Sequence, residues 1–269
     1  MGRRYAIIYT DKSREAYEAA QRAKQLLKRG ETSIEVYSAS KLVDEKLPAE
    51  LDLVIALGGD GTILKTLGAL SRWETPILGI NFGRGGFLAE VESDKLEDAL
   101  KKILAGEYET ERKLMISIRV NGEKIGDAFN EAYIGSQIMG KTLHLEILRN
   151  EVRLAEGLAD GLIVSTPAGS TAYAFSAGGP IVDDSLEGVV LAPICPITGL
   201  RPMVLSLKHE LQILASGDYG IAILLDGYNL KKFDEKSIRI RVERSERLAV
   251  FIRLGLGESF ARRVRKKLC

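Results

Sequence analysis

The sequence predicts two domains of different class: an α/β N-terminal domain built on a doubly wound, mostly parallel sheet, and an all-β C-terminal domain. Residues 1–107 alternate short apolar runs with stretches of helical periodicity, which is typical of parallel strands joined by helices. Residues 108–252 instead alternate apolar and polar side chains with a period of two, which indicates antiparallel sheet with one solvated face. The length of 269 residues and a hydrophobic content of 45% suffice for two modest cores.

The first domain is expected to contain four strands and three helices. Ser13 predicts the start of a helix, whose apolar stripe continues to Leu27 and ends before Gly30. A second helix should follow the glycines after residue 57 and run to about Leu70, and a third should be capped by Ser93 and end near Leu104. The strands are expected at residues 4–10, 33–37, 51–57 and 75–80.

The second domain is expected to begin with a long alternating strand at residues 114–120. Asn121 and Gly122 follow it, and this dipeptide is a strong signal for a β-hairpin. The same alternation returns at residues 143–147 and 237–252. The C-terminal tail, residues 253–269, can form a short helix, and we expect it to pack onto the first domain, which would then be discontinuous.

Composition excludes several classes of protein. Lys and Arg number 38 and Asp and Glu number 37, so the net charge of +1 argues against a dedicated nucleic-acid surface. Two cysteines, Cys195 and Cys269, cannot build a disulfide framework and suit a reducing cytoplasm. No signal peptide and no apolar run of about 18 residues is found. We therefore expect a cytoplasmic protein that acts on small molecules and binds neither nucleic acid nor membrane.

A glycine loop lies where the third strand should meet the second helix. Gly58, Gly59 and Gly61 allow close approach of an anion, and the N–H groups of the following helix, beginning near Thr62, would point at phosphate oxygens. Asp60 is unexpected there, because a carboxylate about 4 Å from a phosphate is repelled by roughly 1–4 kcal/mol. It fits a group that holds a metal bridging to phosphate, or one that takes a proton from an attacking hydroxyl. The alternative is a tight turn with Asp60 as a helix cap.

A second glycine cluster follows the fourth strand and should lie at the same edge of the sheet. It contains Gly83, Gly85 and Gly86, with Arg84 between them and Phe87 beside them. Arg84 could bind phosphate and Phe87 could contact a flat base. The alternative for Arg84 is a solvated loop residue.

A third cluster lies in the β-rich domain, at residues 159–180. Its small and hydroxyl-bearing residues Thr171 and Ala172 and the aromatic Tyr173 suit an adenine or nicotinamide pocket better than a core. Asp160 and the pair Asn130-Glu131 add oxygen acceptors suited to the vicinal hydroxyls of a ribose. The alternative for Asn130-Glu131, taken alone, is an ordinary solvated dipeptide.

Together these segments resemble the NAD kinase family. The resemblance is carried by "GGDGT" at residues 58–62, "GINFGRGGFL", Asn130-Glu131, "DGLIVSTPAGSTAYAFSAGGPI" and "LAPICPITGLRPMVL", with a further "DG" at Asp226-Gly227. It covers residues 53 to about 205. The long motif in the second domain is the most specific part, because diacylglycerol-kinase-like and phosphofructokinase-like enzymes share the glycine pentapeptide.

The resemblance implies phosphorylation of the adenosine-ribose 2′-hydroxyl of NAD, or of NADH, by ATP or polyphosphate to give NADP. It also implies an active site in the cleft between the domains, Mg2+ or another divalent metal with the donor, and a homodimer or homotetramer. Asp60 would be the catalytic aspartate. The phosphate-binding residues would be Gly58, Gly59, Gly61, Thr62 and Arg84, and the NAD-binding residues Phe87, Asn130, Glu131, Asp160, Thr171, Ala172 and Tyr173.

Two positions depart from the family pattern. Ala168 stands where the family often has Thr or Ser, and Gly85 stands where Leu is commoner, so the substrate preference is less well defined. No spacing of His, Cys and Asp indicates a protein-bound metal. The alternative functions are a lipid or sugar kinase that shares the glycine motif, and a dinucleotide sensor without catalysis. Asp60 argues against a sensor, which has little use for a carboxylate that repels phosphate.

Overall fold

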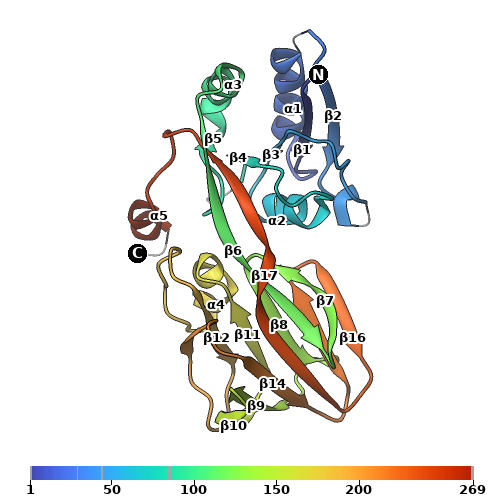
Figure 1. The fold of residues 1–269 in the computed structure, drawn as a ribbon, viewed down its shortest axis with the longest axis vertical. Helices are drawn as coiled ribbons and strands as arrows, with labels where there is room; N and C mark the ends of the chain where they lie inside the picture. The colour runs from blue at the N-terminus through green and yellow to red at the C-terminus, as the bar shows by residue number, and fades with distance from the viewer. Residues whose placement is uncertain (1, 29, 44, 84–85, 268–269) are drawn as a thin grey trace. The chain divides into compact units, whose positions relative to one another are not determined.

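A computed structural model describes residues 2–28, 30–43, 45–83 and 86–267. The chain divides into two compact units, one made of the residues up to Lys113 together with those from Leu248 on, and the other of Leu114–Arg247 (Figure 1). Unit 1 therefore takes its residues from both ends of the chain, and unit 2 is continuous. In the described residues no helix is long and apolar enough to cross a bilayer.

Unit 1 is built on a parallel sheet. Its strands are β1 (Arg4–Tyr9), β2 (Ser33–Ser38), β3 (Leu53–Leu57), β4 (Ile77–Asn81) and β5 (Val91–Glu92). They are joined in the order β4-β3-β1-β2, with β5 beside β4, and every one of these pairings is parallel. The end of β17 (Ser237–Arg253) also pairs with β4 in parallel, through Phe251 and Ile77. The predicted parallel sheet is confirmed.

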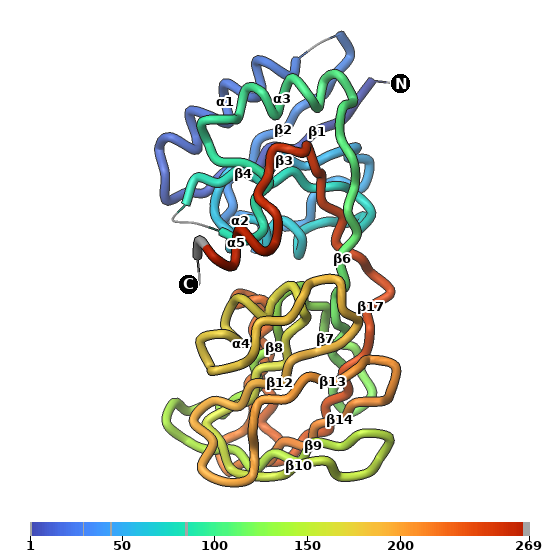
Figure 2. The backbone as a smooth tube through the Cα atoms, turned by 90° about the vertical axis from the view of Figure 1, so that its left-hand side faces the viewer, coloured from blue at the N-terminus to red at the C-terminus, as the bar shows by residue number. Residues whose placement is uncertain are grey.

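Helices cover both faces of this sheet, as the doubly wound prediction requires. The covering helices are α1 (Arg14–Leu27), α2 (Asp60–Ala69) and α3 (Leu96–Ala105). Unit 1 also contains α5 (Phe260–Lys267) and the 3-10 turns η1 (Lys41–Val43) and η2 (Ser93–Lys95). The apolar sides of α1 and α3 pack with Leu78 and Ile80 of β4 in one cluster, and Figure 2 shows the two helices side by side. On the opposite face Ile63 of α2 lies against Gly79.

The predicted helix caps have different outcomes. Ser13 caps α1, since its Oγ accepts a hydrogen bond of 3.2 Å from the N–H of Ala16. Ser93 does not cap α3. It begins the 3-10 turn η2 instead, and Lys95 occupies the N-cap position without a side-chain cap bond. Ser93 therefore marked the place where helical structure begins, but the first turn there is a 3-10 turn and not the start of the α-helix.

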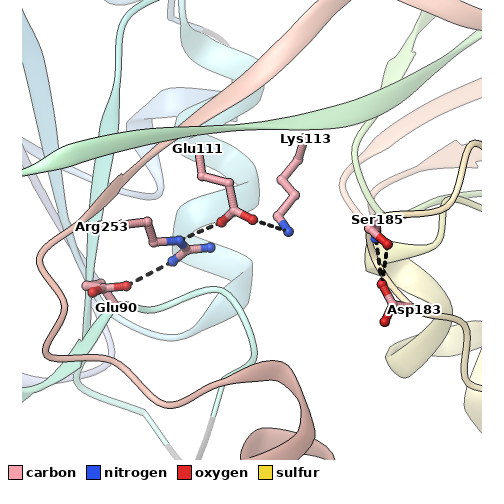
Figure 3. A network of polar contacts seen from close by, with 6 residues as sticks. All are labelled: Glu90, Glu111, Lys113, Asp183, Ser185 and Arg253. Carbon is pink, nitrogen blue, oxygen red and sulfur yellow. Dashed lines mark hydrogen bonds and ion pairs between the residues drawn. The ribbon is translucent and has the colours of Figure 1, made fainter.

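A partly buried ionic network joins distant parts of the chain in unit 1 (Figure 3). The Arg253 guanidinium donates to Glu90 at 3.0 Å and to Glu111 at 2.6 Å, and Lys113 forms an ion pair with the other oxygen of Glu111. Glu90 also accepts the backbone N–H of Leu254 at 2.9 Å. Only 4% of the Glu90 side chain is exposed, so this carboxylate depends on these partners for compensation.

Unit 2 consists of two antiparallel sheets. One contains β6 (Glu109–Val120), β7 (Glu123–Ala128), β9 (Leu143–Arg149), β10 (Val152–Ala159), β14 (Leu211–Ser216) and the first part of β17. The other contains β8 (Glu131–Ser136), β11 (Gly161–Ser165), β12 (Gly188–Ile194), β13 (Met203–Ser206), β15 (Ile221–Leu225) and β16 (Asn229–Phe233), in the order β13-β12-β11-β8-β15-β16. The predicted all-β domain is confirmed.

The core of unit 2 lies between these sheets, where Ile116, Leu145, Ile213 and Ile240 of one sheet pack in a single cluster with residues such as Ile134 of the other. The outer face of the six-stranded sheet packs against the short helix α4 (Tyr173–Ser176), which follows the 3-10 turn η3 (Ala168–Thr171). Six of the seven residues expected to bind the dinucleotide belong to unit 2: Asn130, Glu131, Asp160, Thr171, Ala172 and Tyr173.

Candidate active site

The first glycine loop links β3 to α2. Gly58 lies against the side chain of Thr62, because a Cβ at Gly58 would stand 2.3 Å from the Thr62 Oγ1. A Cβ at Gly59 or Gly61 would meet no heavy atom of the described residues within 4 Å. The first N–H groups of a helix have no partner within it, and the positive end of the helix dipole lies there. The loop can therefore present backbone N–H groups of α2 to an anion over a surface without side chains.

Thr62 itself is turned inward. Only 7% of it is exposed, and its N–H donates to the Gly59 carbonyl at 2.9 Å. Its hydroxyl lies against Gly58, as described above. Phosphate binding by Thr62 stays a prediction. The contacts of Thr62 with Gly58 and Gly59 show that it helps to shape the glycine loop.

Asp60 connects the two glycine clusters. Its carboxylate accepts the backbone N–H of Phe87 at 2.8 Å and that of Leu88 at 3.0 Å. Gly86 is required for this approach, since a Cβ there would lie 2.2 Å from the Asp60 Oδ1. Asp60 is the first residue of α2, and Gly59 occupies the N-cap position without a side-chain cap bond, so the alternative reading of Asp60 as a helix cap is wrong.

The second glycine cluster is described in part. Arg84 and Gly85 lie outside the described residues, so the phosphate-binding part expected of Arg84 stays a prediction. Gly83 lies close to the first loop, with a Cβ there 3.3 Å from the Gly59 Cα. Phe87 is half-buried and bonded to Asp60 through its N–H. The two glycine clusters thus lie against each other at the carboxyl ends of β3 and β4, where the sequence placed them.

In unit 2, Asn130 and Glu131 lie at the start of β8 with buried side chains, 6% and 8% exposed. They are therefore not a solvated dipeptide. The Asn130 Oδ1 and the Glu131 Oε2 have no hydrogen-bond partner among the residues that the structure describes. A buried polar atom left unpaired costs about 1–3 kcal/mol. Two such oxygens side by side in the chain are what a site for hydroxyl donors would contain.

The Glu131 carboxyl has an unusual pKa. Burial is the larger cause and the negative charge of Asp226 the second, and together they raise its pKa to about 8, against the lowering effect of a hydrogen bond from the Tyr173 N–H. This bond also places Glu131 beside the start of α4. At neutral pH the free protein therefore holds Glu131 mostly in its neutral form.

An aromatic pair lies next to these oxygens. The rings of Tyr133 and Tyr173 have centroids 6.1 Å apart and are tilted by 46°. Tyr133 lies across Gly135 and Gly161, because a Cβ at either glycine would come within 2.7 Å of its ring or hydroxyl. The negative charge of Asp160 acts on the Tyr133 hydroxyl, as does Tyr173, although burial is the main cause that raises the pKa of Tyr133.

The sequence predicted no part for Tyr133 and no strand at its position. The signal that could have found it is the pairing of Gly135 with Gly161 across neighbouring strands, which leaves the space that the ring fills. That pairing depends on strand register, which the sequence did not reveal. Tyr173 was predicted, and its side chain is 46% exposed.

Two further predicted residues, Thr171 and Ala172, follow the end of β11 whose last residue, Ser165, pairs with Glu131. Thr171 is buried at the end of η3, and its hydroxyl donates to the Ala168 carbonyl at 3.4 Å. Ala172 is half-buried between η3 and α4. The structure therefore brings Asn130, Glu131, Thr171, Ala172 and Tyr173 together within unit 2. Asp160 precedes the opposite end of β11, and Asp60 and Phe87 belong to unit 1. The prediction of an active site between the domains depends on their relative placement and stays a prediction.

Metal binding by the protein alone finds no support in the described part of the chain, where no group of three or more His, Cys, Asp or Glu side chains could hold a metal ion. Asp60 offers a single carboxylate, which is fewer protein ligands than a resident metal centre has. These residues do not fit a resident metal centre. A divalent ion that arrives bound to a phosphate substrate is a different case, because the substrate supplies ligands of its own.

Comparisons with known proteins match both parts of the chain. The family model described as ATP-NAD kinase N-terminal domain matches residues 2–108, and the one described as ATP-NAD kinase C-terminal domain matches residues 129–254. The NAD kinase of Methanothermobacter thermautotrophicus is 40% identical over 271 residues, which cover 94% of this chain and 92% of that protein. The NAD kinase of Methanopyrus kandleri is 36% identical and covers 77% of this chain and 74% of its own length.

Two solved structures have the same fold. The crystal structure of an NAD kinase from Archaeoglobus fulgidus in complex with ATP has a TM-score of 0.79 and 30% identity, covering 98% of this chain and 97% of that one. The yeast NADH kinase complexed with NADH has a TM-score of 0.83 at 19% identity, covering 100% of this chain and 88% of that one. At that identity the yeast enzyme supports the fold alone.

Proposed function

Because the chain belongs to the NAD kinase family, we propose that it transfers the terminal phosphoryl group of ATP to the 2′-hydroxyl of the adenosine ribose of NAD, with Asp60 as the proton acceptor. The bond from the ribose oxygen to the γ-phosphorus forms as the bond from that phosphorus to the bridging oxygen of ADP breaks. ADP leaves with the electron pair, and the hydroxyl proton passes to the Asp60 carboxylate. The products are NADP and ADP.

The observation that carries this proposal is the place of the Asp60 carboxylate. It stands at the first residue of α2, beside a loop with no side chains at Gly59 and Gly61, and two N–H bonds hold it in one orientation. Each carboxylate oxygen has a second lone pair, so these bonds leave room to accept a hydroxyl proton. A carboxylate fixed at a phosphate-binding loop is suited to activating the nucleophile.

The acceptor is expected to bind through unit 2. The unpartnered oxygens of Asn130 and Glu131 suit the ribose hydroxyls, and the tilted rings of Tyr133 and Tyr173 suit a flat base. Asp160, Thr171, Ala172 and, from unit 1, Phe87 complete the proposed NAD-binding set, and Gly58, Gly59, Gly61, Thr62 and Arg84 the proposed phosphate-binding set. We propose Mg2+ as the partner of ATP in the substrate complex.

Several finer points belong to the same proposal. ATP is preferred to polyphosphate as donor because the Archaeoglobus relative was solved with ATP. NAD is preferred to NADH because the relatives at 36–40% identity are NAD kinases. A homodimer or homotetramer and a cytoplasmic location, expected from the family and from the two cysteines, are retained as proposals.

A direct assay tests the function. Purified protein is incubated with Mg2+, NAD or NADH, and ATP or polyphosphate, and the product is detected with an NADP-specific dehydrogenase. We expect NADP with ATP and NAD. No product with any donor and acceptor would refute the kinase.

Asp60→Asn tests the proton acceptor. The variant should lower kcat by at least about 100-fold, because general-base catalysis contributes on the order of 10²–10⁴. The KM for NAD should change far less than kcat, and thermal unfolding measures the cost of the amide NH2 that opposes one of the N–H groups of Phe87 and Leu88. Near-normal turnover of this variant would show that Asp60 is not the base.

The matched control is Asp52→Asn. Asp52 also accepts a backbone N–H through its carboxylate, that of Arg4 at 2.7 Å, and it belongs to the same unit but lies outside both glycine clusters. Its conversion to the amide should leave kcat unchanged. Equal losses in both variants would indicate a general effect of losing a carboxylate in unit 1.

A further inference from the structure

Asp226 follows β15 and is buried, with 6% of its surface exposed. Its backbone is in the left-handed region, with φ of 48°. The two oxygens of its carboxylate accept three successive backbone N–H groups: Phe129 at 2.8 Å, Asn130 at 2.7 Å and Glu131 at 3.1 Å. The Asp226 N–H in turn donates to the Glu131 carbonyl at 2.9 Å. One side chain thus binds the whole junction between β7 and β8.

The carbonyl side of the same junction is held as well. The Thr166 hydroxyl donates to the Phe129 carbonyl at 2.6 Å, and the Ser165 hydroxyl and the Thr166 N–H donate to the Asn130 carbonyl at 3.0 and 2.9 Å. Gly169 packs directly on this carbonyl, since a Cβ there would lie 2.2 Å from the Asn130 oxygen. The backbone of residues 129–131 is therefore bound from both sides.

This contrasts with the side chains of the same residues. The Asn130 Oδ1 and the Glu131 Oε2 are buried and have no hydrogen-bond partner among the described residues. A backbone held so firmly beside unpaired side-chain oxygens indicates that the oxygens are kept for a ligand with hydroxyl donors. A ribose with vicinal hydroxyls has that chemistry.

We propose that Asp226 is a positioning residue for the dinucleotide: it does not contact the substrate, but its carboxylate fixes residues 129–131 so that the Asn130 and Glu131 oxygens meet the ribose hydroxyls. The inference rests on the proposed function. The negative charge of Asp226 also acts on Glu131, since it is, after burial, a cause of the raised pKa of Glu131.

A carboxylate is needed at this position, for a geometric reason. Three N–H donors require an acceptor with two oxygens, whereas an asparagine has one oxygen and an NH2 group that would oppose an N–H. Asparagine tolerates the left-handed backbone well, so Asp226→Asn removes the second oxygen and the charge without adding backbone strain.

The experiment compares the binding of NAD and of ATP to full-length protein by calorimetry, together with KM and kcat for both substrates. Asp226→Asn should weaken NAD binding by about tenfold or more, as expected when a buried charged acceptor is lost. ATP binding should change by less than about twofold, since its proposed site is in unit 1. A residue with only a structural part would not separate the two substrates in this way.

The matched control is Asp127→Asn. Asp127 is also a buried carboxylate of unit 2, but its partners are side chains: Ser245 at 2.9 Å, Lys124 at 2.8 Å and Arg247 at 3.6 Å. The amide variant should lower thermal stability and leave the affinity for NAD unchanged. Unaltered NAD affinity in Asp226→Asn, or equal losses in both variants, would overturn the proposal.

Asp226→Gly provides a second variant if the asparagine variant does not fold, because glycine favours the left-handed backbone. It should show the same selective loss of NAD binding. Failure of both variants to fold would make Asp226 a structural residue and overturn the inference. If the wild type neither binds NAD nor forms NADP, the proposed function fails. If the wild type does both and the variants match it, the inference about Asp226 fails alone.

Discussion

Glu131 is a buried carboxyl beside a second buried carboxyl, Asp226. Burial raises the pKa of Asp226 to about 6, against the lowering effect of three backbone N–H bonds. The pKa of Glu131 is raised further, to about 8, so Glu131 holds its proton at a pH where Asp226 has lost its own. A ligand that donates two hydroxyls to Glu131 needs the ionised form, which is scarce in the free protein at neutral pH.

This predicts that the affinity for NAD depends on pH. Below the pKa of Glu131, each unit of pH raises the ionised fraction about tenfold, and binding to that fraction strengthens accordingly. Between pH 6 and pH 8 the Kd for NAD, measured by calorimetry, should fall at least about tenfold. In Glu131→Gln the dependence should vanish, because the amide does not titrate. A wild-type Kd that is constant over this range would contradict the assignment of Glu131 as an acceptor for ribose.

A single functional residue could be predicted from the sequence when the pattern around it was local, and not when its hydrogen-bond partners lie far away along the chain. Asp60 attracted notice because a carboxylate among glycines is unusual, and Asn130-Glu131 because its oxygens are acceptors suited to the hydroxyls of a ribose. Asp226 attracted notice only as part of a dipeptide, since its bonded partners lie 95–97 residues earlier in the chain. Local patterns report residue type, whereas the partner of a buried carboxylate is set by tertiary packing.

At the scale of elements, the two glycine clusters form one structure around Asp60. Gly86 allows the second cluster to reach the carboxylate, and Gly59 leaves the surface of the first open. The two glycines serve different purposes. Gly86 is required for the contacts of Asp60 in the free protein, whereas the open surface at Gly59 matters only when a ligand approaches.

Two alanine variants separate these uses. Gly59→Ala should keep the wild-type Tm, because no described atom lies within 4 Å of the new methyl and φ is −87°, and it should raise the KM for ATP several-fold. Gly86→Ala should lower both Tm and kcat, because its methyl would meet Asp60. Thermal unfolding and steady-state kinetics measure both effects. An unchanged KM for ATP in Gly59→Ala would indicate that no phosphate approaches the loop there.

Turns and the strands that they join could be predicted where the residue types in the turn favour its backbone conformation. Asn121 and Gly122 have φ of 49° and 92°, and they form the predicted turn between β6 and β7. The turn between β9 and β10 was not singled out, because its second residue, Glu151, has φ of 63° although glutamate is rare in that conformation. There the pairing of the two strands imposes a backbone that the residue type does not favour.

At the scale of the whole chain, the ionic network around Arg253 holds the C-terminal residues to the first half of the sequence. Its hydrogen bonds link residues 142 and 163 positions apart, so no spacing in the sequence could have indicated them. Glu90 has 4% of its side chain exposed, and its pairing with Arg253 offsets the cost of burying its charge.

Arg253→Leu is therefore expected to reduce the free energy of unfolding of unit 1 by about 3–5 kcal/mol, because it leaves Glu90 without its ionic partner. The control is Arg4→Leu, which breaks an exposed pair with Glu50 and should cost less than about 1 kcal/mol. Urea unfolding followed by circular dichroism measures both. Equal stabilities of the two variants would show that the network contributes no more than a surface pair.

The discontinuity of unit 1 has a consequence for the order of events during translation. Domains usually fold in the order in which the ribosome releases them, the N-terminal one first. Here the residues up to Lys113 leave the exit tunnel first but lack the last strand of their sheet, which arrives only with Leu248–Arg253. Residues 114–247 have all left the ribosome before that. Unit 2 can therefore complete its fold before unit 1, although unit 1 contains the N-terminus.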